Sequence, residues 1–238
     1  MEYVQDLSQM NKLEVLYEDN HVIVVVKPCN VLSQADSTGD LDLLTMVKQY
    51  VKDKYNKPGN VYIGLVHRLD RPVGGVMVFA RSSKAASRLS QMIKERQLNK
   101  NYLAIVRGLF DQKEGEYTDY LYKEDNGNTI VTTKEKGKLA KLKYKVLDEN
   151  KSNNLSLVEI ELLTGRHHQI RVQFASRGHN LYGDQRYGIK DNKQIALWAY
   201  RLEFIHPVKK ELMHFTHFPP KNDTWKIFDI KKWNCSCI

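Results

Sequence analysis

Several stretches of the chain alternate apolar and polar residues, which is the pattern of a β-strand with one buried face. In 139–147 apolar residues alternate with lysines, and in 158–162 they alternate with Glu159 and Glu161. The polar stretch 150–154 separates the two runs. We therefore predict a β-hairpin whose first strand has one packed face and one face of lysines. We call these lysines the lysine row: Lys141, Lys143 and Lys145.

The remaining elements follow from shorter apolar runs, from apolar residues spaced by three and four, and from turn residues. Strands are predicted at 13–17, 22–27, 61–66, 76–80, 102–106 and 195–205. Helices are predicted at 41–55, after an N-cap at Ser82 or Ser83, and at 169–177. Strands dominate and several neighbours are joined by hairpins, so we predict an α+β fold on a large, mainly antiparallel sheet.

No internal repeat, low-complexity segment or linker divides the sequence of 238 residues. The simplest interpretation is a single domain over 13–238, preceded by a loose polar arm over 1–12. No apolar run approaches the length of a membrane span, and the N-terminus is acidic, unlike a signal or transit peptide. We therefore expect a cytoplasmic protein that does not contact a membrane.

Charge and cysteine content narrow the choice of partner. The formal net charge is +9, which suggests a polyanion such as nucleic acid, and the lysine row suggests phosphate contacts. The alternative is an ordinary basic protein whose lysine row is a solvated strand face. Cys29, Cys235 and Cys237 lack the spacing of a metal or redox site, so we expect neither a metal nor a redox cofactor.

The first segment that suggests chemistry is 64–72, where charged residues interrupt a predicted strand. Asp70 lies there between Arg68 and Arg71. Catalytic groups often lie in loops at strand ends, and the flanking cations favour an ionised carboxylate. The alternative is an exposed aspartate in a turn with ordinary surface ion pairs.

The second segment is 162–171, where a strand ends and a polar cluster opens the predicted helix. His167, His168 and Arg171 are predicted to share a face of that helix, as a basic wall toward an anion. Metal binding by the two histidines is disfavoured, because adjacent helical residues diverge by about 100°. The alternative is a helix start with solvated polar residues.

Together with two further segments, these form an ordered series: His67-Arg68-Leu69-Asp70-Arg71, Lys100-Asn101-Tyr102-Leu103-Ala104, Thr164-Gly165-Arg166-His167-His168-Gln169-Ile170-Arg171, and Gly178-His179 with Gly183-Asp184-Gln185-Arg186-Tyr187-Gly188. The series resembles the motifs of the RluA family of pseudouridine synthases, and the similarity covers about residues 13–220. It implies the pseudouridine synthase fold, in which a large bent, mainly antiparallel sheet with flanking helices surrounds a central RNA-binding cleft.

The resemblance also implies roles for single residues. Asp70 matches the catalytic aspartate, Tyr102 the tyrosine that lies against the target base, and Arg171 the basic residue that pairs with the aspartate. Arg68 matches an arginine that binds RNA in the gap left by the flipped nucleotide. The implied activity is that of a cofactor-free isomerase that converts uridine to pseudouridine in ribosomal or transfer RNA. A monomer is the default expectation, because the sequence does not indicate an oligomeric state.

The chain departs from the family pattern in places. After Asp70 the family often has Thr-Ser-Gly, whereas this chain has Pro72-Val73-Gly74-Gly75. Many relatives carry a small S4-like RNA-binding domain before the catalytic one, and the residues before Leu13 are too few for it. Three alternatives stay open: a uracil-excising glycosylase, a uridine C5 methyltransferase, which needs a cysteine nucleophile, and a non-catalytic RNA-binding module.

Overall fold

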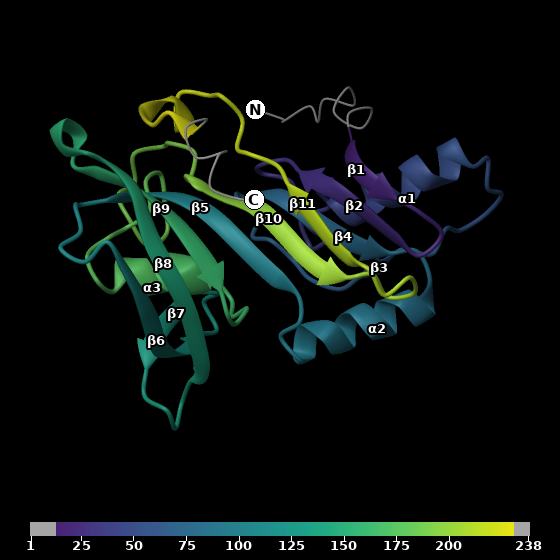
Figure 1. Ribbon diagram of the computed structural model, residues 1–238, viewed down its shortest axis with the longest axis horizontal. Coiled ribbons are helices and arrows are strands. Elements are labelled where there is room, and N and C mark those ends of the chain that lie inside the picture. The colour runs from purple at the N-terminus through teal and green to yellow at the C-terminus, as the bar shows by residue number, and fades with distance from the viewer. Residues whose placement is uncertain (1–12, 231–238) are drawn as a thin grey trace. The chain divides into compact units, whose positions relative to one another are not determined.

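The computed structural model describes residues 13–230, which divide into two compact units (Figure 1). Unit 1 contains 13–98 and 201–217, and unit 2 contains 99–200 and 218–230. Within the described residues the chain forms an 11-stranded open sheet and three α-helices, which confirms the predicted α+β class. The predicted arm over 1–12 lies outside the described residues, and the single domain stays a prediction.

Unit 1 is built on antiparallel strands in the order β1-β2-β4, with β3 also paired to β4 and β11 paired to β10. The strands are β1 (Glu14–Glu18), β2 (Val22–Lys27), β3 (Gly64–Leu65), β4 (Gly74–Ala80), β11 (Leu212–Thr216) and the part of β10 (Leu197–Ile205) that follows residue 200. The helices are α1 (Leu43–Lys54) and α2 (Ser83–Lys94).

The core of unit 1 explains why these elements form. Every residue of β2 and of β4 is buried, and apart from Lys27 at the end of β2 both strands are continuous apolar runs instead of alternating ones. Helix α2 packs against β3 and β4 through its apolar face (Figure 1). Its N-cap is Ser82, as predicted, since the Ser82 hydroxyl accepts a hydrogen bond from the Ala85 N–H at 3.2 Å.

Unit 2 has antiparallel strands in the order β5-β9-β8-β6-β7 and one α-helix. The elements are β5 (Asn99–Arg107), β6 (Glu114–Lys123), β7 (Thr129–Thr132), β8 (Lys138–Asn150), β9 (Leu155–Leu162), α3 (Gln169–Ala175) and the first part of β10. The 3₁₀ turns η2 (Lys151–Asn153) and η3 (Trp225–Ile227) complete it. The predicted hairpin is confirmed, because η2 joins β8 to β9 and Asn154 takes the left-handed conformation.

Helix α3 contacts β6 and β7 (Figure 1), and its residues from Gln169 to Phe174 are buried. An aromatic cluster joins the helix to the sheet. The Phe174 ring lies 5.2 Å from Tyr117 and 6.1 Å from Tyr144, both in edge-on arrangements that aromatic pairs prefer. These contacts hold the helix on one face of the sheet.

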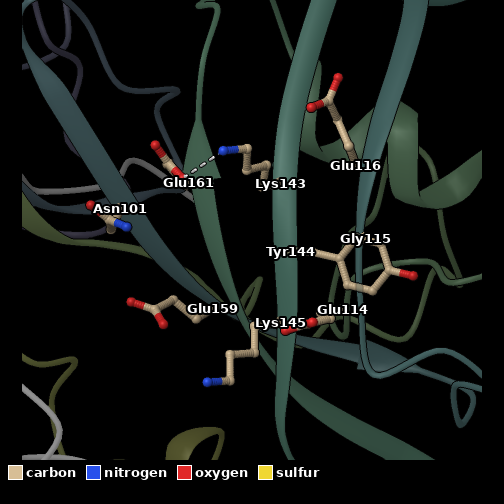
Figure 2. Close-up of a pocket in the computed structure, with 9 residues that line it drawn as sticks. All are labelled: Asn101, Glu114, Gly115, Glu116, Lys143, Tyr144, Lys145, Glu159 and Glu161. Atoms are coloured by element: carbon tan, nitrogen blue, oxygen red, sulfur yellow. Dashed lines mark ion pairs between the residues drawn. The ribbon is translucent and has the colours of Figure 1, made fainter.

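The lysine row lies on β8 as predicted, but its charge is compensated by glutamates of the neighbouring strands. Lys143 stands between Glu116 of β6 and Glu161 of β9 in the register, and its ammonium lies 3.9 Å from Glu161. Lys145 is flanked in the same way by Glu114 and Glu159, and Lys141 forms an ion pair with Glu116 at 3.3 Å. Figure 2 shows these strands and the pocket that their side chains line. The surroundings disfavour phosphate contacts here.

None of the helices within 13–230 combines the length and the apolar composition that a transmembrane segment needs.

Candidate active site

The Asp70 loop, residues 66–73, connects β3 to β4 in unit 1. Exposure alternates along it: His67 and Leu69 are buried, Arg68 is exposed and Asp70 is partly exposed. The loop then turns back, because the Val73 N–H donates to the Asp70 carbonyl at 3.0 Å. Two buried anchors therefore present Arg68 and Asp70 away from the core of the unit.

The anchors are fixed by side-chain to backbone hydrogen bonds. His67 accepts from the Val78 N–H through Nε2 at 3.1 Å, which ties the loop to β4. The Ser33 hydroxyl accepts from the Leu69 N–H at 3.1 Å and donates to the Leu69 carbonyl at 2.8 Å. Both backbone groups of the residue before Asp70 are thus satisfied by one buried side chain.

The two arginines beside Asp70 differ in their contacts. Arg71 forms an ion pair with Asp40 at 2.6 Å, and its Nε donates to the Asn30 carbonyl at 3.3 Å. Arg68 has neither a hydrogen-bond nor an ion-pair partner among residues 13–230. The Arg71 guanidinium is therefore already bound by protein groups, whereas the exposed guanidinium of Arg68 is available to a ligand.

Tyr102 lies in unit 2, on β5, and is 5% exposed. It faces Ile160 of β9, which in turn faces Tyr144 of β8, so these three side chains share one face of the sheet. Tyr144 contacts Phe174 of α3. The structure thus places Tyr102 on the sheet face that carries α3, the helix of Arg171.

Arg171 forms a buried ion pair with Asp184. Its Nε and Nη2 atoms donate to the two carboxylate oxygens at 2.8 and 2.7 Å, and the side chains are 7% and 1% exposed. The Tyr187 ring also lies 5.2 Å from the guanidinium carbon. A bidentate pair fixes the plane of a guanidinium, so Arg171 has a defined orientation.

Burial raises the pKa of Asp184, but several opposing contacts together hold it below its ordinary value. These are the hydrogen bond and charge of Arg171, and the N–H groups of Arg186 and Tyr187, which donate to Asp184 Oδ1 at 2.9 and 3.1 Å. Asp184 is therefore an ionised carboxylate that braces Arg171.

The prediction that His167 and His168 share a helix face with Arg171 is wrong. Helix α3 begins at Gln169, and His168 precedes it with a φ of 51°. The reason is local: the Gln169 side chain accepts from the Arg166 N–H at 3.0 Å, which closes a turn before the helix starts. The centroids of the two imidazole rings instead lie 3.7 Å apart, with the ring planes tilted by 31°.

The two histidines also form hydrogen bonds in the surroundings of Arg171. His168 Nδ1 is hydrogen-bonded to the Tyr187 hydroxyl at 2.7 Å, and His167 Nδ1 to the Thr129 hydroxyl at 2.9 Å. Tyr187 thus connects the turn before α3 to the Arg171 guanidinium, which lies over its ring.

Sequence reasoning assigned no role to Asp184 or Tyr187, although both lie in a segment of the motif series. The sequence showed an acidic and an aromatic residue in that segment. Their contacts with Arg171 could not be predicted, because they arise only from the fold. As for metals, no group of three or more candidate ligands occurs within 13–230.

Comparisons with known proteins agree with this architecture. Residues 21–176 match the family of RNA pseudouridylate synthases. An uncharacterized RNA pseudouridine synthase of Bacillus subtilis is 34% identical over 211 residues, which are 87% of this chain and 68% of the relative. The ribosomal large subunit pseudouridine synthase C of Salmonella typhimurium is 31% identical over 212 residues, which are 84% of this chain and 64% of that protein. The chain spans about two thirds of their length.

Two solved human structures show the same fold. RNA Pseudouridylate Synthase Domain Containing 4 has a TM-score of 0.75 at 21% identity and covers 92% of this chain and 94% of that one. RNA Pseudouridylate Synthase Domain Containing 1 has a TM-score of 0.73 at 24% identity, with 90% and 86% covered. The α+β sheet described above is thus the pseudouridine synthase fold. By sequence, the chain belongs to the RNA pseudouridylate synthase family, and the resemblance to its RluA branch is confirmed.

Proposed function

We propose that this chain isomerises uridine to pseudouridine within RNA and that Asp70 is the nucleophile. The observation that carries the proposal is family membership over 21–176, a range that contains Asp70 on its anchored loop. The reaction breaks the bond between N1 and C1′, turns the uracil and joins C5 to C1′. It oxidises nothing and adds no water, so the residues named here can carry it without a redox cofactor.

The target uridine has to leave the base stack first, at a cost of a few kcal/mol. Arg68 suits the gap that the nucleotide leaves, because its guanidinium is exposed and has no partner within 13–230. Asp70 then attacks as a carboxylate, either at C1′ or at C6 of the base, as carboxylates do in covalent glycosidase intermediates.

The roles proposed for Tyr102 and Arg171 rest on the motif series and on their surroundings in unit 2. Tyr102 offers an aromatic face for the uracil and a phenol oxygen for proton transfer. Arg171 supplies a permanent positive charge whose direction Asp184 and Tyr187 fix. Such a charge favours the ionised form of a nearby carboxylate nucleophile.

The substrate class is RNA, and we propose large-subunit ribosomal RNA as the first candidate because several relatives carry that function in their names. Transfer RNA is the second candidate. Mapping pseudouridines in total RNA with and without the gene identifies the target. If a ribosomal RNA site lacks pseudouridine when the gene is absent, the first candidate is supported. If the missing pseudouridine is in transfer RNA, transfer RNA is the substrate instead.

The alternatives predict other products, and the comparisons give them no support. A glycosylase releases free uracil, a methyltransferase requires a methyl donor, and a binding module yields no product. Incubating the purified protein with RNA tritiated at the uracil C5, with no methyl donor present, distinguishes all three from an isomerase, which releases the tritium while the uracil stays attached to the ribose.

Replacing Tyr102 by phenylalanine separates proton transfer from packing. We expect Tyr102→Phe to bind RNA normally, because stacking on the base, worth about 1–3 kcal/mol, needs only the ring. A proton has to leave C5 to restore the uracil, and general-base help is worth about 10²- to 10⁴-fold. We therefore expect a loss of turnover of that size, measured by single-turnover kinetics.

A thermal melt of Tyr102→Phe is the folding control, since Tyr102 is buried. Tyr117→Phe is the matched control, because Tyr117 is also a buried tyrosine on the α3 side of unit 2. Normal melting together with wild-type turnover in Tyr102→Phe leaves Tyr102 as a packing residue.

The lysine row and Arg68 give opposite expectations for the salt dependence of RNA binding. The net charge of +9 predicts an affinity that falls steeply with salt, and each phosphate contact adds about 0.7–0.9 to the log–log slope. Because Lys143 and Lys145 are compensated by glutamates, we expect the variant Lys143→Met, Lys145→Met to keep the wild-type slope. We expect Arg68→Met to lower it by about one contact. A slope reduced by two contacts in the double variant assigns phosphate binding to the row.

A further inference from the structure

Lys100 of β5 stands two residues before Tyr102, so the two side chains lie on the same face of the strand. Asn101, the residue between them, lies on the opposite face, where Figure 2 draws it with Glu161 and Lys143. Lys100 is therefore on the face of unit 2 that carries Tyr102 and α3, away from the lysine row. Two residues of a strand span about 6.6 Å, so Lys100 borders the place proposed for the target base.

The Lys100 ammonium has no protein group among the described residues that compensates its charge. It forms neither a hydrogen bond nor an ion pair within 13–230, whereas Lys141 and Lys143 on the other face each have a glutamate. The side chain is only partly exposed, and burial lowers the pKa of Lys100 with no carboxylate acting against this effect. Lysines that are largely removed from water are usually paired. An anionic ligand supplies the charge that the described residues do not.

Gly165, in the turn before α3, leaves space beside this ammonium. A Cβ on Gly165 would lie 3.7 Å from Lys100 Nζ and would meet no other part of the protein within 4 Å apart from its chain neighbours. The φ of Gly165 is not left-handed, so the backbone there does not require a glycine. The next residue, Arg166, is exposed and forms no ion pair within 13–230. The approach to Lys100 is thus open and positively charged.

We propose that Lys100 binds a phosphate of the RNA backbone next to the target uridine, and that Gly165 keeps the approach to its ammonium open. This inference rests on the proposed function, in which RNA is the ligand and the target base lies against Tyr102. Lysines bind phosphates as point charges through charge-assisted hydrogen bonds. Phosphate contacts fix the position of a nucleic acid without reading its sequence. Lys100 therefore positions the target nucleotide and does not select it.

The test measures binding of a fluorescently labelled oligouridylate by the full chain at several salt concentrations. We expect Lys100→Met to weaken binding about 10- to 100-fold, the size of a hydrogen bond to a charged group. The log–log salt slope should fall by about 0.7, the value for one phosphate of a single strand. A wild-type slope in Lys100→Met overturns the proposal.

Lys143→Met is the matched control, because it removes the same charge from the opposite face of unit 2, where Glu116 and Glu161 flank it. We expect it to keep the wild-type slope. If Lys143→Met lowers the slope as much as Lys100→Met does, only the net charge matters and the proposal is overturned.

Stability is a second readout, which a structural role of Lys100 moves in the opposite direction. Lys100→Met removes an ammonium whose burial no acid within 13–230 offsets, so we expect its urea midpoint to lie at or above that of the wild type. A midpoint clearly below the wild-type value shows that Lys100 supports the fold, and it overturns the proposal.

Gly165→Ala tests the approach to the ammonium without removing a charge. The added methyl lies at an ordinary contact distance and the backbone conformation suits alanine, so the fold should persist. We expect weaker binding of the oligouridylate and a slope lowered as in Lys100→Met. Wild-type affinity and slope in Gly165→Ala overturn the role given to Gly165.

The two proposals fail in different ways. If the wild type makes no pseudouridine in any RNA fraction, the proposed function fails, whatever the binding curves show. If the wild type is active and Lys100→Met binds the oligouridylate with wild-type affinity and slope, only the phosphate contact fails.

Discussion

Asp70→Asn is expected to abolish pseudouridine formation, with a loss of about 10⁴-fold or more, the size seen when a covalent nucleophile is removed. An amide keeps the shape of the carboxylate but is not a nucleophile. The fold should survive, because the side chain is partly exposed and the turn at this position uses the Asp70 backbone carbonyl. RNA affinity should stay close to that of the wild type.

Single-turnover kinetics on a uridine-containing RNA measure the loss, and mass spectrometry of the variant excludes deamidation back to aspartate. Asp40→Asn provides the matched control. It makes the same chemical change at the ion-pair partner of Arg71, where a surface pair contributes about 0–1 kcal/mol. We expect its rate to stay within a few-fold of the wild type. Near wild-type turnover by pure Asp70→Asn removes Asp70 from the chemistry.

Local sequence was enough to predict the elements that carry their own signal. The valine run of β2 needs no neighbour to be identified as a buried strand, and the alternation of β8 defines its faces. The Ser82 cap and the spaced apolar residues define α2. In each case the residues that form the element also supply the pattern that predicts it.

The strands that the sequence did not reveal depend on their neighbours. Strand β6 carries only Tyr117 and Leu121 as buried apolar residues, among charges and a glycine. Its pattern makes sense only beside β8, where Glu114 and Glu116 face Lys145 and Lys143. Strands β7 and β11 have four and five residues, too few to define a period. Of the predicted strand 61–66, only Gly64–Leu65 forms. Gly64 already pairs with Ala80, the last residue of β4, so the residues before it have no strand partner there.

In the candidate site, too, some residues could be predicted from local sequence and others depend on the fold. The motif series located Asp70, Arg68, Tyr102 and Arg171 along the chain, because such residues lie in short characteristic segments. The contacts that hold these residues in place could not be predicted from the sequence. Arg171 is braced by Asp184, which is 13 residues away in the sequence and adjacent only in the fold.

The ion pair of Arg171 and Asp184 gives the largest expected effect on stability. Arg171→Ala leaves a carboxylate that is 1% exposed without its guanidinium, and breaking such a buried pair costs about 3–5 kcal/mol of the free energy of unfolding. Arg71→Ala removes an arginine whose partner is partly exposed, and costs about 0–1 kcal/mol. Urea unfolding of the two variants measures the difference, and we expect Arg171→Ala to lose more activity too.

The pH dependence of the free energy of unfolding tests whether the Asp184 carboxylate is left as an unpaired buried charge in Arg171→Ala. In the wild type the pKa of Asp184 is below its ordinary value, so its contribution is present above the unfolded pKa and is lost as pH falls through the folded one. In Arg171→Ala burial acts without the compensating cation and raises that pKa, so the destabilisation is relieved as the carboxyl takes up a proton. The gap in stability between wild type and variant should therefore narrow toward acid pH, and a gap independent of pH argues against a stranded carboxylate.

A second substitution separates the structural role of Arg171 from its role in the reaction. In the Arg171→Ala background, Asp184→Asn removes the stranded charge while the amide oxygen still accepts from the N–H groups of Arg186 and Tyr187. We expect the double variant to recover a large part of the lost stability, because a neutral hydrogen-bonded group is much cheaper to bury than an unpaired charge. Turnover should not recover, since the positive charge proposed to act on Asp70 is still missing. Recovery of turnover together with stability reduces Arg171 to the partner of Asp184 and excludes it from the chemistry.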